Sequence, residues 1–340
     1  MTAKNSFRLA AIQAVPVFFD RYASTEKACS LIKEAGAMGA TIAGFGETWL
    51  PGYPFFIYAQ TQPLTFKALA EYIASAVEIP SPTTEKLCAA AKSAGVDVVI
   101  GIVERDRATQ GTVYCTLLFI GRDGCILGRH RKIKPTFVER AAWGEGDAQG
   151  LRVHERPYGR ISGLNCWEHN LMLPGYALAA QGTQIHVAAW PGREPSAAPP
   201  APVTLWPRQL LLSRAFASQA ACYVIAVGGV RRRADTPERY RELSGFGETG
   251  DSYIIDPRGE VIAGPASGET ILIAEGSMEA VLAAKAVADI AGHYSRPDIL
   301  RLLVDRRPLE RISNIAPQDN APCLRTELVH PNEISGSRAD

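Results

Sequence analysis

Three segments of the sequence carry a carboxylate, an amine and a thiol in settings where each could take part in covalent chemistry. In the first, TIAGFGETWLPGYPF (41–55), Glu47 follows an apolar run and precedes a turn that contains Pro51, Gly52 and Pro54. A carboxylate at the carboxyl end of a buried strand lies where α/β sheets hold their ligands. A dry pocket would raise its pKa toward the range useful for proton transfer, whereas a solvated loop would leave an ordinary surface glutamate.

The second segment, GRHRKIKPTFVERAAWGEGD (128–147), contains a run of cations that ends at Pro135. Such a run is commonly a solvated face. Alternation along an extended strand would nevertheless put Lys132 on the face opposite Arg131 and Ile133, so that a single lysine could point inward. Glu139 follows within reach of the same turn.

The third segment places Cys166 between a strand-like run, RISGLN (160–165), and a sequence of helical character. This arrangement is typical of a nucleophile held at a sharp turn, where the helix dipole and nearby cations favour the thiolate over the thiol. The alternative is a buried cysteine that packs as a small hydrophobe, which is the interpretation for the other six cysteines.

Read together and in this order, GFGETWLPGYPF, HRKIKPTFVERAAWGEGD, CWEH, YALAAQGTQIHVAAWP and GHYSRPD resemble the nitrilase family of carbon-nitrogen hydrolases. The bacterial aliphatic and arylacetonitrile-hydrolysing members are the most similar. The resemblance runs from about Arg8 to Leu303, and the spacings of the three chemical groups are 85 (132 minus 47) and 34 (166 minus 132).

The resemblance implies a catalytic triad of Glu47, Lys132 and Cys166, with Glu139 as a second glutamate in the site. It implies an α/β fold, a four-layer α-β-β-α sandwich, and association through outer helices into homodimers or larger spiral homo-oligomers. It implies no cofactor and no metal. The expected reaction is hydrolysis of a small organic nitrile to a carboxylic acid and ammonia through a thioimidate and a thioester on the cysteine.

Other activities remain open at this stage. The same triad could act on amides or N-carbamoyl compounds, or hydration could stop at the amide. From a different class, the chain could be a catalytically silent scaffold that assembles through its surface, although the intact triad argues against this. The several aromatic residues near Glu47 favour arylacetonitriles over short aliphatic nitriles.

Four residues are candidates for the wall of a substrate pocket: Tyr53, Trp167, His169 and Trp190. Core packing is an equally good interpretation for each. His169 stands three residues after Cys166, which suggests a Cys/His dyad, but two positions so close on one turn are poorly placed for proton abstraction. Gly44 departs from the family pattern in the strand before Glu47, where a glycine weakens the strand or admits a close neighbour.

The elements that must position these groups alternate between short apolar runs and longer helical segments, as in a layered α/β domain. The predicted strands are 8–14, 41–46, 97–103, 114–120, 160–165, 184–190, 222–228, 252–256 and 270–274. The predicted helices are 23–37, 64–76, 84–94, 173–181, 205–221 and 278–290, the third of which has a start signal at Ser81 to Thr84.

Composition restricts the class of protein. The 340 residues are 46% hydrophobic and carry a net charge of +1, which indicates a large core and no broad surface for nucleic acid or an anionic membrane. Seven scattered cysteines without metal-ligand spacing indicate reduced thiols in a cytoplasmic protein. No segment approaches the roughly 18 uninterrupted apolar residues of a membrane span.

Residues 1–312 are expected to form one hydrolase domain, and 313–340 to form an extended or disordered tail. The proline-rich stretch 192–207 is expected to be a surface loop. GFGETG (245–250) matches a dinucleotide-binding pattern, but it precedes a strand instead of opening a helix, so we discard that interpretation.

Overall fold

Two six-stranded sheets dominate the computed structural model, which describes residues 6–59, 62–192, 207–244, 248–309 and 311–312. The first sheet has the order β14 (Thr270–Ser277), β1 (Ser6–Gln13), β2 (Ile42–Phe45), β3 (Asp97–Arg105), β4 (Val113–Ile120) and β5 (Ile126–Arg131). The second has the order β13 (Val261–Ala263), β12 (Tyr253–Ile255), β9 (Tyr223–Gly228), β8 (Ile185–Trp190), β7 (Gly159–Asn165) and β6 (His154–Arg156). A small pair joins β10 (Val230–Arg231) to β11 (Glu248–Thr249).

Both sheets follow one plan: three neighbouring parallel strands are flanked by antiparallel ones. The parallel strands are β1, β2 and β3 in the first sheet and β7, β8 and β9 in the second. Carboxyl ends of parallel strands share an edge of the sheet, which is where α/β proteins place their functional groups.

The helices are α1 (Arg21–Ala37), α2 (Gln62–Ala74), α3 (Pro82–Ala94), α4 (Met172–Ala179), α5 (Pro207–Ala220) and α6 (Met278–Val287). The described residues also form five short 3-10 helices: η1 (Phe55–Tyr58), η2 (Phe137–Ala141), η3 (Cys166–Asn170), η4 (Arg233–Asp235) and η5 (Glu238–Leu243). The predicted start of α3 is confirmed, because Ser81 and Thr84 form a reciprocal capping box.

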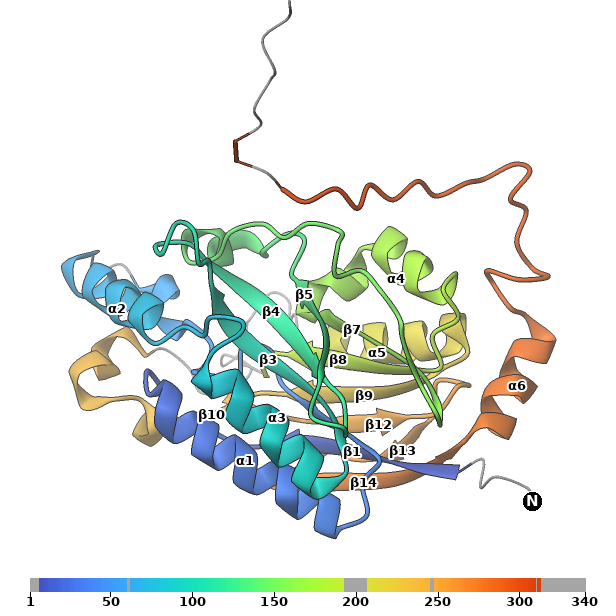
Figure 1. Ribbon diagram of the computed structural model, residues 1–340, viewed down its shortest axis with the longest axis horizontal. Coiled ribbons are helices and arrows are strands. Elements are labelled where there is room, and N and C mark those ends of the chain that lie inside the picture. Colours follow the sequence, from blue (N-terminus) through green and yellow to red (C-terminus); the bar gives the residue numbers. More distant parts are fainter. Residues whose placement is uncertain (1–5, 60–61, 193–206, 245–247, 310, 313–340) are drawn as a thin grey trace, which may run out of the picture. The chain divides into compact units, whose positions relative to one another are not determined.

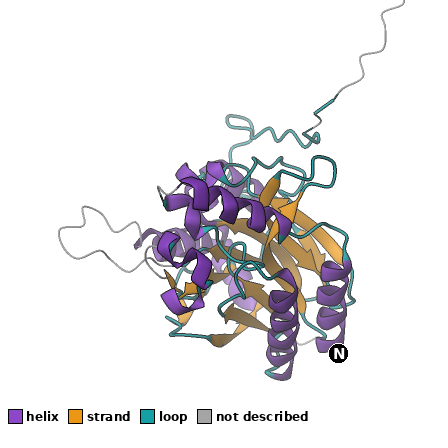
Figure 2. Ribbon diagram, turned by 90° about the vertical axis from the view of Figure 1, so that its left-hand side faces the viewer, coloured by secondary structure: helices purple, strands orange, loops and turns teal. Residues whose placement is uncertain are grey.

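Alternation along the strands builds three apolar layers. On β1, Leu9 and Ala11 face the second sheet, while Ala10 and Ile12 face the helices α1 and α3. A third cluster lies between the second sheet and α5. Figure 1 shows α1 and α3 side by side over the first sheet, and Figure 2 shows the strands between groups of helices. The predicted four-layer α-β-β-α sandwich is therefore confirmed.

Gly44 lies at a close approach of the two sheets. A Cβ at this position would lie 3.0 Å from Val187 Cγ1 and 3.3 Å from Ile225 Cγ2, both in the second sheet. The sequence allowed two interpretations of this glycine, a weakened strand or a close neighbour, and the structure shows the close neighbour.

Every predicted strand and helix is present, with ends shifted by at most a few residues. The sequence analysis missed β5, β6, β10, β11 and β13, most of which are too short to show a period. One unit of the chain ends at Pro308, and in the unit that begins at Leu309 only three residues are described. The predicted tail, most of the proline-rich loop and the start of GFGETG lie outside the described residues.

Candidate active site

Glu47 stands just beyond the carboxyl end of β2, at the junction of the two sheets. Its backbone N–H donates a hydrogen bond to the carbonyl of Trp190, the last residue of β8, at 3.1 Å. The next turn is held by the indole N–H of Trp49, which donates to the carbonyl of Ala14 at 2.8 Å. The Glu47 side chain is 2% exposed, so its carboxylate is fixed in a dry environment.

Lys132 follows β5, and the alternation of that strand turns it inward. His130 and Lys132 are both buried on one side, whereas Arg131 between them pairs with Glu104 of β3 at 2.6 Å on the other. The backbone N–H of Lys132 donates to the carbonyl of Cys115 at 2.7 Å, which continues the pairing with β4. Lys132 is therefore the lysine of this basic segment whose ammonium points into the interior, whereas Lys134 is exposed.

The Lys132 ammonium lies between two buried carboxylates. It donates to Glu47 Oε1 at 2.8 Å and to Glu139 Oε2 at 2.6 Å. Glu139, in η2, also accepts from the backbone N–H of Thr136 at 2.7 Å and from the hydroxyl of Tyr53 at 2.9 Å. Its carboxylate is thus held on three sides, which fixes the direction of the ammonium.

Cys166 brings a thiol to the same place. It directly follows β7 and begins η3, with a φ of +48°, a conformation that a non-glycine residue adopts only when its surroundings hold it there. The Cys166 sulfur and one carboxylate oxygen each of Glu47 and Glu139 lie within 4.8 Å of one another. The structure therefore gathers all four residues that the resemblance implied for the catalytic centre.

Two carboxylates and a thiol could also serve as metal ligands. Here the Lys132 ammonium already supplies a cation within hydrogen-bond distance of both carboxylates. These residues therefore fit a site whose positive charge belongs to the chain itself.

Burial governs the pKa values in this cluster. It raises the pKa of Glu47 to about 8, helped by the charge of Glu139 and opposed by Lys132. Burial lowers the pKa of Lys132, but Glu47, Cys166 and Glu139 outweigh it and raise that pKa well above its usual value. The ammonium is therefore charged at neutral pH, whereas Glu47 is poised to exchange a proton.

The expectation that cations hold Cys166 as a thiolate is wrong for the resting site. Burial, followed by the charge of Glu47, raises the pKa of the Cys166 thiol well above its ordinary value. Lys132 and the backbone N–H of Trp167 lower this pKa, but not enough to offset the other two. The helix dipole adds little, because η3 separates Cys166 from α4. Cys166 consequently needs a base to take its proton.

Glu168 and Cys115 are two further buried residues at the site that the sequence reasoning missed. Glu168 accepts hydrogen bonds from His130 Nε2 and from the backbone N–H groups of Ile133 and Asn165. The thiol of Cys115 donates to Glu47 Oε1 at 3.5 Å. No spacing in the sequence indicates either contact. The CWEH segment could have suggested Glu168, but not which groups it binds.

The four residues predicted to line a substrate pocket make different contacts around the cluster. Tyr53 is bound to Glu139, and Trp167 is half-buried against the cluster below α5. His169 stacks on Trp190 with ring centroids 5.1 Å apart and donates from Nδ1 to the carbonyl oxygen of Cys166 at 2.7 Å. The Trp190 indole N–H donates to Ser213 Oγ. His169 thus contacts the backbone of the nucleophile, which excludes the Cys/His dyad.

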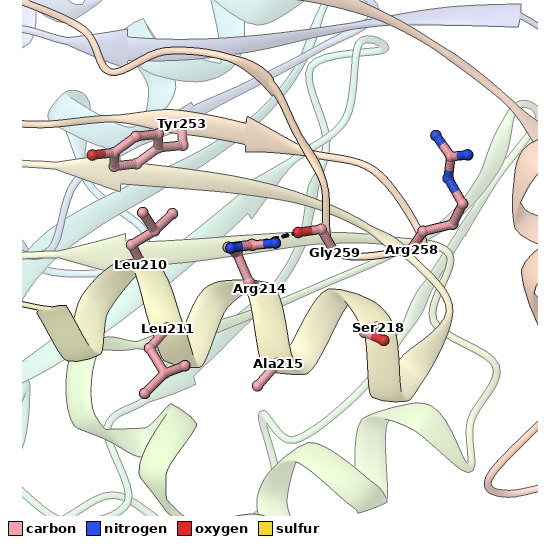
Figure 3. A pocket seen from close by; sticks show the side chains of 8 residues that line it. All are labelled: Leu210, Leu211, Arg214, Ala215, Ser218, Tyr253, Arg258 and Gly259. Atoms are coloured by element: carbon pink, nitrogen blue, oxygen red, sulfur yellow. Dashed lines mark hydrogen bonds between the residues drawn. The ribbon is translucent and has the colours of Figure 1, made fainter.

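A surface hollow of about 670 Å³ lies away from these residues, along the outer face of α5 (Figure 3). Leu210, Arg214 and Tyr253 are among its lining residues, and Arg214 donates from Nε to the carbonyl of Gly259 at 2.6 Å. None of the residues that line it belongs to the carboxylate, amine and thiol cluster.

Comparison with known proteins agrees with this fold and identifies the family. Residues 8–286 match the carbon-nitrogen hydrolase family. Over 306 residues the chain is 54% identical to "Nitrilase 2" of an unknown prokaryotic organism, covering 89% of this chain and 94% of that one. It is 37% identical to an aliphatic nitrilase of Rhodococcus rhodochrous, covering 89% and 84%.

Among solved structures, a carbon-nitrogen hydrolase from Helicobacter pylori G27 superposes with a TM-score of 0.67 at 20% identity, covering 84% of this chain and 93% of that one. That likeness concerns the fold alone. The chain belongs to the carbon-nitrogen hydrolase family, and the resemblance to nitrilases is confirmed.

Proposed function

We propose that this chain is a nitrilase that converts an organic nitrile to a carboxylic acid and ammonia, with Cys166 as the nucleophile. The observation that carries the proposal is the Lys132 ammonium held between Glu47 and Glu139, with the Cys166 sulfur within 4.8 Å of a carboxylate oxygen of each. The names of the relatives at 54% and 37% identity support nitriles as the substrates.

In the first step, Glu47 takes the proton of the Cys166 thiol and the sulfur adds to the nitrile carbon. The C≡N bond becomes C=N, and the nitrogen gains negative charge and then a proton, which gives a thioimidate. Lys132 and the backbone N–H of Trp167 stabilise this nitrogen. A pKa of about 8 suits Glu47 to this role, because a general base works best near the operating pH.

In the second stage, Glu47 activates a water molecule that adds to the thioimidate carbon. Ammonia leaves with the electrons of the C–N bond, and a thioester remains on Cys166. A second water hydrolyses the thioester, which releases the carboxylic acid and restores the thiol. Two water molecules are consumed for each nitrile, and every proton passes between groups already in the site. These reaction steps therefore need no cofactor.

The decisive experiment measures ammonia release from a panel of arylacetonitriles, aliphatic nitriles and the corresponding amides, with analysis of acid and amide products. Release of ammonia and acid from nitriles is expected, and arylacetonitriles should be preferred. Cys166→Ala should abolish release, whereas Cys222→Ala, at another buried thiol outside the site, should not. Ammonia from amides alone would indicate an amidase or N-carbamoyl hydrolase, amide as the sole product would indicate a hydratase, and no turnover would favour a scaffold.

We also propose that the chain acts as a homodimer or larger spiral homo-oligomer in the cytoplasm, and that residues 1–312 form its hydrolase domain. Exposed apolar side chains on the outer helices support association: Leu211 on α5 and Leu282 and Val287 on α6 are each more than half exposed. Within the described ranges, no helix combines the length and apolarity that a bilayer crossing requires. Light scattering with Leu282→Glu, expected to give smaller particles, tests the assembly.

A further inference from the structure

A chain of hydrogen bonds ends on the backbone of the proposed nucleophile, and the reaction steps above do not use it. His169 Nδ1 lies 2.7 Å from the carbonyl oxygen of Cys166, and His169 Nε2 lies 3.0 Å from His186 Nε2. His186 Nδ1 lies 2.8 Å from Ser162 Oγ, which lies 2.6 Å from Thr183 Oγ1. Ser162, Thr183 and His186 are fully buried in the second sheet and the turn beside it.

The chemistry of the end groups fixes the direction of this chain. A carbonyl oxygen only accepts, so His169 Nδ1 must carry a hydrogen. A neutral imidazole has one N–H, so His169 Nε2 accepts from the N–H at His186 Nε2. His186 Nδ1 then accepts from the hydroxyl of Ser162, which in turn accepts from Thr183. Every donor in the series therefore points toward Cys166.

Both rings are neutral in this arrangement. Burial holds the pKa of His169 at about 4, although the carbonyl of Cys166 and the charge of Glu168 raise it. Burial, with the two other histidines nearby, holds the pKa of His186 well below its usual value. Glu168, the preceding residue, favours a positive charge on His169, whereas Lys132 and His130 from β5 and the turn after it disfavour one.

The consequence for the site follows from the planarity of the peptide bond. The carbonyl of Cys166 and the N–H of Trp167 belong to one trans peptide and point in opposite directions. A group that fixes the carbonyl therefore fixes the N–H. The Trp167 N–H lowers the pKa of the Cys166 thiol. The peptide that carries it follows Cys166, whose backbone is strained at a φ of +48°.

We infer that His169 and His186 are positioning residues, which hold the Cys166 carbonyl so that the Trp167 N–H is aimed at the sulfur and at the nitrogen of the thioimidate. The inference rests on the proposed function, because it assigns a role around the same nucleophile. It also gives a role to the stack of His169 on Trp190 beside the nucleophile.

The test compares two amide substitutions at one position. The Nδ2 of Asn occupies nearly the place of imidazole Nδ1, whereas the Nε2 of Gln reproduces the other ring nitrogen. His169→Asn should keep kcat within about threefold of the wild type. His169→Gln should lower kcat by about 100-fold, as for loss of one transition-state donor, with little change in KM. His154→Asn, at a histidine outside the site, is the matched control and should leave kcat unchanged.

A second readout needs no substrate. The rate of Cys166 alkylation by iodoacetamide, followed against pH by mass spectrometry of its peptide, should move to higher pH in His169→Gln and not in His169→Asn. Equal losses of kcat in the two variants with an unchanged alkylation profile would overturn the inference. So would a His169→Gln enzyme within twofold of the wild type.

The wild-type protein gives a further test that does not depend on the folding of a variant. Its ¹⁵N spectrum should show His169 as the Nδ1–H tautomer and His186 as the Nε2–H tautomer, both neutral at pH 7. The opposite tautomers would overturn the inference. Failure of the proposed function is distinguishable, since it would appear in the products of the substrate panel or as ammonia release that survives Cys166→Ala, and neither result bears on the tautomers of the two histidines.

Discussion

The backbone N–H of Ile133 donates a hydrogen bond to Glu168 Oε1 at 2.8 Å, and this contact joins the residue after Lys132 to the turn that begins at Cys166. The other oxygen of the same carboxylate accepts from the N–H of Asn165, the residue before the nucleophile, at 2.9 Å. One buried carboxylate therefore sets the relative positions of the amine and the thiol.

Glu168→Gln should weaken both stability and catalysis. Burial opposes ionisation of Glu168, yet His130 and the two backbone N–H groups hold its pKa below the usual value, so the native site is built around a carboxylate. An amide would turn an NH2 group toward one of these donors. We expect unfolding to become about 3 kcal/mol easier, the upper range for a charged hydrogen bond, as measured by urea titration.

The control for this substitution is Glu145→Gln, at an exposed carboxylate that pairs with the exposed Lys134. Its effect should stay within about 0.5 kcal/mol, as for other surface positions. Equal stabilities of the two variants would show that the Glu168 contacts contribute nothing measurable.

Lys132→Met should abolish ammonia release and destabilise the fold in a pH-dependent way. Without the ammonium, Glu47 and Glu139 would lie buried with no cation, which costs about 3–5 kcal/mol for a broken buried pair. Loss of the ammonium would raise the pKa of Glu47 further, so the folded variant would bind more protons than the unfolded chain. The loss should therefore be larger at pH 8 than at pH 5. Lys86→Met, at an exposed pair with Glu26, should show neither effect.

The pH profile of kcat/KM should rise to a plateau with a midpoint near 8. Burial raises the pKa of Glu47 to about 8, and the carboxyl is protonated below that pH and unable to accept the thiol proton. Activity should therefore fall as the pH drops through 8. Since Lys132 and Glu139 interact strongly with Glu47, the midpoint belongs to the cluster as a whole. A midpoint near 4.5 would contradict a buried base.

Gly44→Ala should destabilise the protein by about 1–3 kcal/mol, the usual cost of overpacking a core. The added methyl would lie 3.0 Å from Val187 Cγ1, and the opposing sheet has no flexible side-chain end to move aside. Gly111→Ala is the matched control, because a Cβ there would meet only the carbonyl oxygen of Thr109 at 3.9 Å. Thermal unfolding should give a lower Tm for Gly44→Ala than for Gly111→Ala. Equal Tm values would show that the effect comes from replacing a glycine and not from steric overlap.

Glu47 and Cys166 could be predicted from sequence because each follows a predicted strand, and the carboxyl ends of parallel strands meet at one edge. Lys132 follows β5, which was not predicted, so its role rested on the resemblance of the motifs. The environment of each group could not be predicted. Cys115 reaches Glu47 through the order β2-β3-β4 of the first sheet, which no spacing in the sequence gives. The raised pKa of Cys166 was missed for the same reason, since nearby cations can be read from the sequence while burial cannot.

The sequence could not decide whether aromatic residues near the motifs line a substrate pocket or pack in the core, because it does not show which side of a turn faces the substrate. His169 and Trp190 pack against each other beside the nucleophile, although their positions in the motifs had suggested a pocket wall. The short strands β6 and β13 contain three residues each, too few for an alternation to be visible.

The pairing of β1 with β14 has a consequence for how the chain is made. Ser6 is opposite Ser277, so β1 keeps one unpaired edge until β14 has emerged from the ribosome. Nascent chains that stall before residue 270 would each expose this edge of β1. Pairing between the exposed edges of two chains would compete with the native pairing of β1 and β14. Truncation within β14 should therefore lower the yield of dispersed protein even though every residue of the chemical cluster has already been synthesised.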